Sequence, residues 1–294
     1  MKKYAYFPGC SLEKMALSYH QSSMETTQAL GVELEELEDW NCCGATACFN
    51  LDNTLAHTLV ARNLAMAEKE GLDFVAPCSA CYKNSYTTNT YLKEDENLAK
   101  KINYALEADN LQVTGDLTVY HLIDIFAEQI GVDAIKAKVT QPLNGLKIAP
   151  YYGCQIVRPR KNGENVEAPQ FFEEILNATG AEAVDFANKT RCCGAALLIT
   201  NRKAALQMIQ ILLQNALQSG AEIIATACPL CQVNLEVYQT QVNEEFGTNY
   251  AIPVLYFTQL MGLALGIAPQ KLGIGSELVS TLPLLSRYIK KEVG

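Results

Sequence analysis

The sequence has no basic stripe and little excess of positive charge anywhere along its length. Of its 294 residues, 23 are Lys or Arg and 32 are Asp or Glu, which leaves a formal net charge of −9. Proteins that bind duplex nucleic acid ordinarily carry a basic patch on one face. We therefore expect no nucleic-acid partner.

The chain also lacks a signal-peptide pattern at its start. Residues 1–15, MKKYAYFPGCSLEKM, carry a basic pair but no apolar core, whereas a secretory signal contains an apolar stretch of roughly 7–15 residues. Nothing marks the protein for export, so we expect it in the cytoplasm. Stable disulfides are rare in that reducing compartment.

No apolar run clearly reaches the roughly 20 residues that span a bilayer. The longest, residues 252–269, aligns with residues 117–131, which carry Asp124 and Glu128 and have the pattern of an ordinary amphipathic helix. We therefore expect a helix in both segments, the later one buried within the protein.

What the sequence does have is an internal repeat marked by cysteine. FPGC at 7–10 matches YYGC at 151–154, and NCCGA at 41–45 matches RCCGA at 191–195. The spacing is C-x31-CCG-x33-C-x2-C in the first copy and C-x37-CCG-x33-C-x2-C in the second, so ten of the eleven cysteines fall into two registers. The first cysteine set is Cys10, Cys42, Cys43, Cys78 and Cys81, and the second cysteine set is Cys154, Cys192, Cys193, Cys228 and Cys231.

The repeat predicts two duplicated α/β domains, residues 1–145 and 146–294. Pro142 and Gly145 break the pattern at the joint. Apolar patterns alternate between strands and helices, which favours a small parallel sheet flanked by helices in each half, the halves being related by a pseudo-twofold axis. The predicted strands are 2–7, 32–37, 72–77, 146–152, 182–186 and 222–227. The predicted helices are 18–30, 53–70, 169–180 and 200–220. The cysteines follow the strands, where parallel sheets place their sites, so each set should converge.

Five converging thiols allow several interpretations. Structural disulfides conflict with a reducing compartment. A thioredoxin-like pair would explain Cys78 and Cys81 but not the other cysteines. A tetrahedral zinc site needs four ligands and usually takes them from close pairs. An iron–sulfur cluster fits best, because cysteine thiolate is its normal ligand and four or more are required.

The glycine after each cysteine doublet has a role in that interpretation. Gly44 and Gly194 have no side chain to keep backbone N–H groups away from the negatively charged sulfur atoms. We also expect the helix that starts after each CCG to direct its positive N-terminal end toward the site.

This pattern resembles the cysteine-rich CCG-domain family and, within it, the B subunit of heterodisulfide reductase. The resemblance extends to ARNLAMAEKEGLD, IPVLYFTQLMGLALG and PLLSRY. It implies that each cysteine set, all five members included, binds one non-cubane [4Fe-4S] cluster. It also implies that the two clusters face each other and reduce the disulfide between coenzyme M and coenzyme B. The expected partners are a ferredoxin-like iron–sulfur subunit and a flavoprotein subunit.

The resemblance leaves the substrate open. Methanogenic members tend to have a histidine after the first cysteine of the second half, where this chain has Gln155. YFPGCSL and DWNCCGAT also resemble the CCG subunit of non-classical succinate dehydrogenases and fumarate reductases, which exchanges electrons with quinone. A quinone substrate would place the protein peripherally at the cytoplasmic face of the membrane. A substrate-free electron-transfer subunit and an accessory protein of a hydroxy-acid oxidase are further alternatives.

Four further features carry expectations. Arg158 and Arg160 follow Cys154 and could hold an anionic group of the substrate, since guanidinium binds carboxylates in a bidentate way. Cys48 lies outside both registers and is expected to be a small buried residue. His121 aligns with Tyr256, each with its polar end packed near the last helix of its half. The recurring asparagines, Asn84 and Asn234, should cap or orient the helix after the C-x2-C motif.

Overall fold

The structure is a computed structural model that describes residues 1–45, 47–159 and 165–289. Each half of the chain contains one parallel sheet of four strands, with the order β2-β1-β3-β4 in the first half and β6-β5-β7-β8 in the second. The strands of the first sheet are β1 Lys2–Tyr6, β2 Val32–Glu36, β3 Phe74–Ala76 and β4 Val119–His121. Those of the second are β5 Lys147–Tyr151, β6 Glu182–Ala183, β7 Ile223–Thr226 and β8 Val254–Tyr256. The predicted α/β class, duplication and parallel sheets are confirmed.

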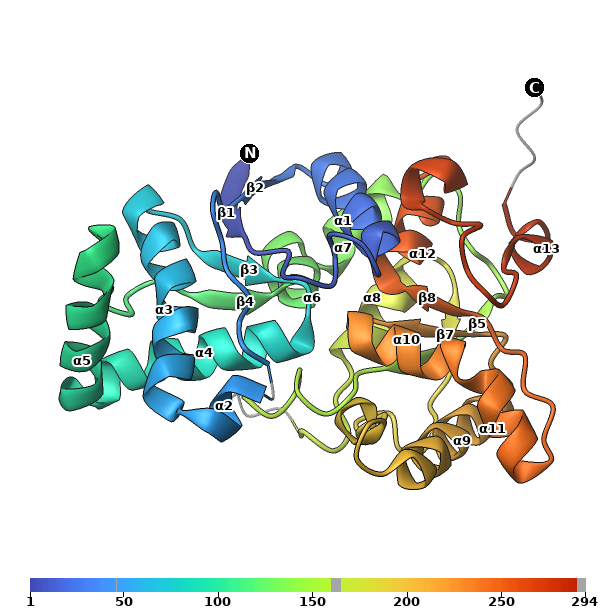
Figure 1. Cartoon of the computed structure of the whole chain (residues 1–294). Coiled ribbons are helices and arrows are strands. Elements are labelled where there is room, and N and C mark those ends of the chain that lie inside the picture. Colours follow the sequence, from blue (N-terminus) through green and yellow to red (C-terminus); the bar gives the residue numbers. More distant parts are fainter. Residues whose placement is uncertain (46, 160–164, 290–294) are drawn as a thin grey trace.

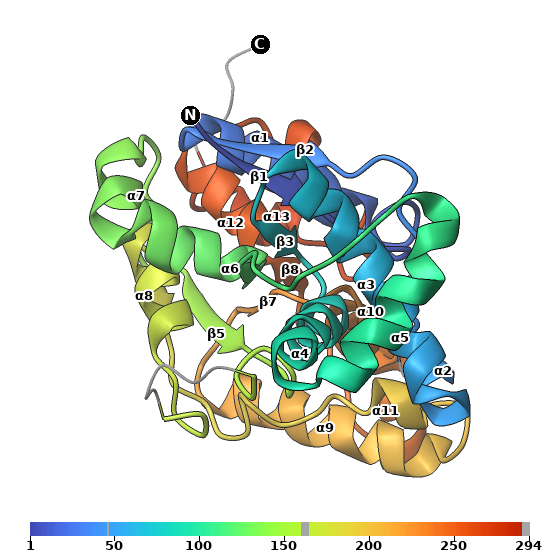
Figure 2. The ribbon, with the colours of Figure 1, turned by 90° about the vertical axis from the view of Figure 1, so that its left-hand side faces the viewer.

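Helices flank both sheets (Figures 1 and 2). The first half contains α1 Leu17–Ala29, α2 Ala47–Leu51, α3 Asn53–Glu70, α4 Ser79–Glu94, α5 Glu96–Leu106, η1 Glu107–Asp109, α6 Leu122–Asp124, the π-helical η2 Ile125–Ile130 and α7 Val132–Lys138. The second half contains α8 Phe171–Ala178, η3 Ala195–Leu197, α9 Arg202–Gln218, α10 Pro229–Val237, α11 Gln239–Phe246, α12 Phe257–Ala264, η4 Pro269–Leu272 and α13 Leu282–Leu285. Helices α3, α4 and α5 pack together beside the first sheet, as α9, α10 and α11 do beside the second.

Local chemistry explains the bounds of α3, which coincide with the prediction. The Asp52 carboxylate caps its first turn by accepting a hydrogen bond from Leu55 N. Gly71 ends the helix in the left-handed conformation, with φ of 67°.

Residues 117–131 and 252–269 each contain the expected helix, but neither segment begins with it. Each segment opens with a strand, β4 or β8, that pairs with β3 or β7, and only then turns into a helix. Three residues are too few for periodicity to separate a strand from a helical turn, so pairing with the neighbouring strand decides the conformation. In the part of the chain that the structure describes, none of the helices combines the length and apolar character that a bilayer crossing needs.

Helices of the first half pack against helices of the second half. Helix α1 of the first half lies against α12 of the second, and η2 of the first half lies against α8 of the second. Ser22 Oγ is 2.7 Å from Thr258 Oγ1, and the Phe126 and Phe257 rings meet edge to face at 5.0 Å. One hydrophobic core therefore contains residues from both halves. These contacts are reciprocal, as a pseudo-twofold relation requires. The domain boundary between residues 145 and 146 stays a prediction.

Candidate metal centre

The ten repeat cysteines lie after the strands, as the sequence predicts. Cys10 and Cys154 follow β1 and β5, the CCG motifs follow β2 and β6, and the C-x2-C motifs follow β3 and β7. Cys78 and Cys228 are the N-cap residues of α4 and α10. Because all the strands within a sheet are parallel, their carboxyl ends share one edge and bring the thiols of each half together.

The first cysteine set forms two close sulfur pairs. Cys10 Sγ lies 3.9 Å from Cys42 Sγ, and Cys43 Sγ lies 3.3 Å from Cys81 Sγ. Cys10 and Cys42 are exposed, whereas Cys43, Cys78 and Cys81 are buried. The set therefore extends from the surface into the interior.

The second cysteine set repeats this arrangement. Cys193 Sγ lies 3.7 Å from Cys231 Sγ, and the Cys192 thiol raises the pKa of Cys154. Cys154 and Cys192 are half-buried, and the other three members are buried. The Gly194 N–H donates to Cys192 Sγ at 3.3 Å, so the backbone beside this doublet does approach a sulfur.

The two sets meet inside the protein. The Cys78 thiol of the first set and the Cys228 thiol of the second influence each other, because this neighbour raises the pKa of Cys78 and lowers that of Cys228. Within each set every member has at least one thiol neighbour. Each thiol therefore neighbours the next in one continuous run of ten thiols. The order is Cys10, Cys42, Cys43, Cys81, Cys78, Cys228, Cys231, Cys193, Cys192 and Cys154.

Shared protons drive the pKa values of neighbouring thiols apart. Hydrogen bonds from Cys42 and then Cys81 lower the pKa of Cys43 to about 3, and the contact with Cys43 raises the pKa of Cys42. Hydrogen bonds from Cys154 and then Cys193 lower the pKa of Cys192 to about 2, with a smaller contribution from Arg158. Each set thus stabilises a thiolate, the form in which cysteine binds metals.

The CCG glycines also have a backbone role. Gly44 and Gly194 have φ of 66° and 84°, and a Cβ on Gly44 would lie 2.8 Å from Cys48 Cβ. Helices α3 and α9 follow the CCG motifs, as expected, but a five-residue α2 and the single turn η3 lie between each motif and its long helix. The backbone donors therefore come from turns at the CCG motifs rather than from long helices.

Sequence reasoning missed a second pair of glycines. Gly9 and Gly153, which precede the first cysteine of each set, have φ of 71° and 70°. A Cβ there would lie 3.1 Å from Cys81 Sγ or 3.2 Å from Cys231 Sγ. Only glycine therefore allows the loop after the first strand to pack this closely on the last thiol of its set. The shared GC in FPGC and YYGC is the signal that could have found it.

The recurring asparagines join two parts of each site. Asn84 Nδ2 donates to Cys43 O at 3.4 Å, and Asn234 Nδ2 donates to Cys193 O at 3.1 Å. Both side chains are buried. They do not cap their helices; they attach α4 and α10 to the CCG loops.

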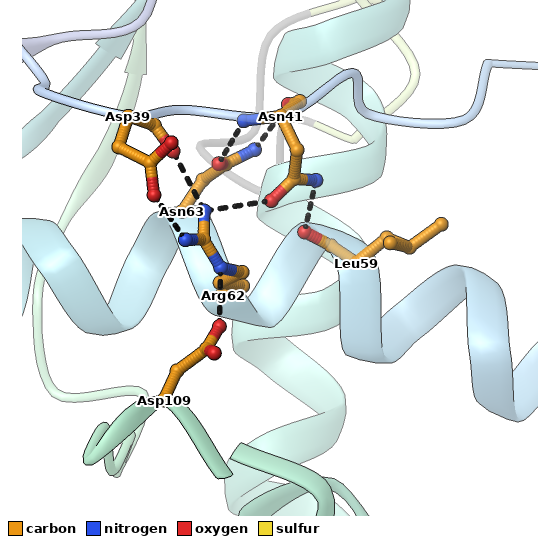
Figure 3. A network of polar contacts seen from close by, with 6 residues as sticks. All are labelled: Asp39, Asn41, Leu59, Arg62, Asn63 and Asp109. Atoms are coloured by element: carbon orange, nitrogen blue, oxygen red, sulfur yellow. Dashed lines mark hydrogen bonds and ion pairs between the residues drawn. The ribbon is translucent and has the colours of Figure 1, made fainter.

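The segment before the first CCG is anchored to α3 (Figure 3). Asn41 and Asn63 exchange two hydrogen bonds, Asn41 N to Asn63 Oδ1 at 3.0 Å and Asn63 Nδ2 to Asn41 O at 2.8 Å. The Arg62 guanidinium donates to Asp39 O at 2.7 Å and pairs with the carboxylates of Asp39 and Asp109. This network holds the chain in place directly before Cys42.

The second half uses a different anchor. Lys189 Nζ is buried and lies 2.5 Å from Glu173 Oε1, while Tyr152 donates its O–H to the same carboxylate. Burial alone would lower the pKa of Lys189, but Glu173 and Asp185 together raise it. Lys189 O also accepts hydrogen bonds from the backbone N–H groups of Tyr152 and Gly153. The loop that carries Cys154 is thus fastened to the segment before Cys192.

Arg158 lies at the surface end of the second cysteine set. It lines a pocket of about 590 Å³ together with Cys154, Cys192 and Arg191. Arg191 was not predicted as a site residue; it occupies the position of Asn41 in the first copy. Arg160 falls outside the described residues.

Cys48 differs from its prediction. It lies on α2, is half-buried rather than buried, and contacts Gly44 closely. The structure shows no sulfur pair between Cys48 and the described members of either set.

The thiols fit a polynuclear group better than a single ion. Among the described residues, no three His, Cys, Asp or Glu side chains are grouped as one metal ion would need. An iron–sulfur cluster has several irons, so its thiolates can occupy a larger volume. The five thiols of each half, the lowered pKa of Cys43 or Cys192 among them, and the glycine turns beside them suit such a group.

The fold and site define a duplicated cysteine-rich α/β protein. The family described as "Cysteine-rich domain" (CCG) matches residues 4–84 and 148–236, more than half of the chain. The chain belongs to this family.

Relatives of known name match over nearly the whole length. The chain is 33% identical to the B subunit of the ferredoxin/F(420)H(2)-dependent CoB-CoM heterodisulfide reductase of Methanosarcina acetivorans, with coverage of 100% of this chain and 99% of the relative. It is 34% identical to the "8-methylmenaquinol:fumarate reductase membrane anchor subunit" of Wolinella succinogenes, covering 96% and 99%. A crystal structure of a hypothetical protein from Helicobacter pylori has the same fold, with a TM-score of 0.77 at 16% identity over 95% of this chain and 52% of that one. The resemblance to the B subunit of heterodisulfide reductase is confirmed over the full chain.

Proposed function

We propose that this chain is the iron–sulfur catalytic subunit of a heterodisulfide reductase-like complex, an oxidoreductase. The observation that carries the proposal is the run of ten thiols joined at Cys78 and Cys228. Two groups bound along this run would lie next to each other and could act on the two halves of one substrate. When bound, iron–sulfur clusters of this kind supply electrons for the reduction of a disulfide.

In this proposal each cysteine set holds one non-cubane [4Fe-4S] cluster. The ligands are all ten repeat cysteines, and Gly44 and Gly194 hold the CCG turns that bring backbone N–H groups to the sulfur atoms. Buried Asn84 and Asn234 keep these turns in register with the C-x2-C motifs. The protein thus holds both sets rigid, which limits rearrangement when charge changes.

Arg158 and Arg160 are the proposed substrate-binding residues. Arg158 lines the pocket beside Cys154 and Cys192, and Arg191 adds a second guanidinium to that pocket. The heterodisulfide of coenzyme M and coenzyme B, or a bacterial analogue, is anionic, and guanidinium groups hold anions by charge-assisted hydrogen bonds.

A quinone-linked role is the second candidate, supported by the relative from Wolinella succinogenes that is named as a subunit of a menaquinol:fumarate reductase. In that role the chain would exchange electrons with quinone and lie at the cytoplasmic face of the membrane. A quinone head group is neutral, so it carries no negative charge that the guanidinium groups of the Arg158 pocket could bind.

Both roles require partner subunits. The relatives are named as subunits of reductases, which supports assembly into a complex. The proposed partners are a ferredoxin-like iron–sulfur subunit and a flavoprotein subunit, with no nucleic acid involved.

The deciding experiment uses the complex purified anaerobically from its host through a tag on this chain. Turnover is measured with the coenzyme M–coenzyme B disulfide and reduced viologen, and in parallel with a short-chain menaquinol. Disulfide reduction without quinone turnover supports the first role, and the reverse supports the second. A preparation with zinc and little iron would contradict both.

A further inference from the structure

Two buried hydroxyls in the second half have no hydrogen-bond partner among the described residues. The side chains of Thr226 and Tyr256 are 0% and 2% exposed, and neither Thr226 Oγ1 nor Tyr256 Oη finds an acceptor in that part of the chain. A buried O–H without a partner costs free energy, and folded proteins ordinarily satisfy such groups. The two hydroxyls therefore lack an acceptor among the described residues, although their burial calls for one.

The two residues are neighbours at the edge of the sheet where the cysteines gather. Thr226 ends β7, Tyr256 ends β8, and the two are register partners in the parallel ladder. Register partners present their side chains on the same face of a sheet. Cys228 follows Thr226 by two residues, so both hydroxyls lie at the end of the sheet that carries the second cysteine set.

Electrostatics place the Tyr256 phenol among the thiols. Burial is the main cause that raises its pKa, followed by the charges of Cys228, Glu236, Cys78 and Cys231. The phenol stays protonated at neutral pH and remains a donor. The Glu236 carboxylate is already occupied by Gln232 Nε2 and Val279 N, which leaves sulfur as the acceptor chemistry at hand.

The first half does not repeat this pair. The aligned register partners there are Ala76 and His121, and the His121 ring accepts a hydrogen bond from Ile123 N. The two hydroxyls are therefore a property of the second half, although the cysteine spacing from each CCG to its C-x2-C motif is the same.

We propose that the hydroxyls of Tyr256 and Thr226 donate hydrogen bonds to sulfur atoms of the cluster held by the second cysteine set and thereby raise its reduction potential. Hydrogen bonds to cluster sulfurs stabilise the more negative, reduced state. The two residues act only through these hydrogen bonds to sulfur and do not bind iron. The inference rests on the proposed function in one respect, the presence of that cluster.

Tyr19 provides a matched control. Its ring stacks on that of Tyr256 with centroids 4.2 Å apart and planes 2° apart, and it is equally buried. Its O–H, however, donates to Ala227 O at 3.2 Å and is satisfied within the protein. Tyr19→Phe thus removes a phenol from the same stack without removing an unpartnered donor.

The test is a redox titration of the anaerobically purified chain, followed by electron paramagnetic resonance, on protein whose iron content equals that of the wild type. Tyr256→Phe and Thr226→Val should each shift one of the two midpoint potentials to a more negative value. Thr226→Ser, which keeps the hydroxyl, should retain the wild-type value, as should Tyr19→Phe.

Unchanged midpoints in iron-loaded Tyr256→Phe and Thr226→Val would overturn the inference and leave the proposed function intact. An equal shift in Tyr19→Phe would also overturn it, because the stack and not the free hydroxyl would then be responsible. Wild-type protein without iron would instead refute the proposed function, and the inference with it, so the two failures are distinguishable.

Discussion

The thiols of Cys78 and Cys228 shift each other's pKa across the boundary between the two halves of the chain, upward for Cys78 and downward for Cys228. Each is buried, and each occupies the N-cap position of the helix that follows its own strand. One contact therefore joins two sites that the sequence repeats separately.

Iron content is the first prediction. Anaerobically purified protein should hold roughly eight iron atoms per chain, four for each cysteine set, and absorb broadly in the visible. Removal of the iron by a chelator should lower the melting temperature, because a group that binds only the folded chain stabilises it. Metal analysis and a thermal scan check both points; zinc in place of iron would contradict the assignment.

Cys48→Ala should retain the full iron content, whereas Cys43→Ala and Cys193→Ala should each lose one cluster. Cys43 and Cys193 pair with Cys81 and Cys231, while Cys48 lies on a short helix that buries none of its described side chains. Iron determination on the three variants makes the comparison. An equal loss from Cys48→Ala would show that the ligand assignment is mistaken.

Asn84→Ala and Asn234→Ala should each destabilise the protein by about 1 kcal/mol, because each removes a buried hydrogen bond to a CCG carbonyl and leaves that oxygen unpaired. Urea denaturation under anaerobic conditions measures the change. Asn97→Ala, at an exposed position of α5, is the control and should have little effect. Equal changes in the free energy of unfolding at all three positions would show that the hydrogen bonds to the CCG loops make no particular contribution to stability.

Arg158→Ala should raise KM for an anionic disulfide about tenfold, through loss of a charge-assisted hydrogen bond, and Arg158→Ala combined with Arg160→Ala should raise it further. Added salt should shrink the difference from the wild type, since exposed charges are screened. Turnover of a neutral quinol should barely change. Arg202→Ala, exposed at the start of α9, is the matched control. Unchanged disulfide kinetics in iron-loaded Arg158→Ala would exclude this side chain from the site.

The stability of the protein should fall as the pH drops below 6.5, in part because of His57. Burial, and then the charge of Lys83, lowers the pKa of this histidine from 6.5. Between 6.5 and the lowered folded value, the unfolded chain takes up a proton that the folded chain does not, so acid favours unfolding. His57→Gln keeps a partner for Thr88 Oγ1 but cannot titrate. Urea denaturation at pH 7.5 and 5.5 should show a larger loss for the wild type than for His57→Gln, and parallel profiles would contradict this.

The sequence by itself determined the duplication, the parallel α/β class and the grouping of five thiols in each half. These follow from local information: the spacing of cysteines and the alternation of apolar patterns, which place every motif at the carboxyl end of a strand. It also located α3 and its end at Gly71, because the apolar spacing and the terminal glycine are contained in the segment itself.

Only the tertiary structure decided how these parts combine. Strands β4 and β8 are three residues long and take their form from β3 and β7. The contacts between Cys78 and Cys228 and between Tyr19 and Tyr256 join residues 150 and 237 positions apart. No local pattern encodes such contacts, because they depend on the packing of α1 against α12 and on the facing edges of the two sheets. The unpartnered hydroxyls of Thr226 and Tyr256 likewise depend on the packing around β7 and β8, which no local pattern encodes.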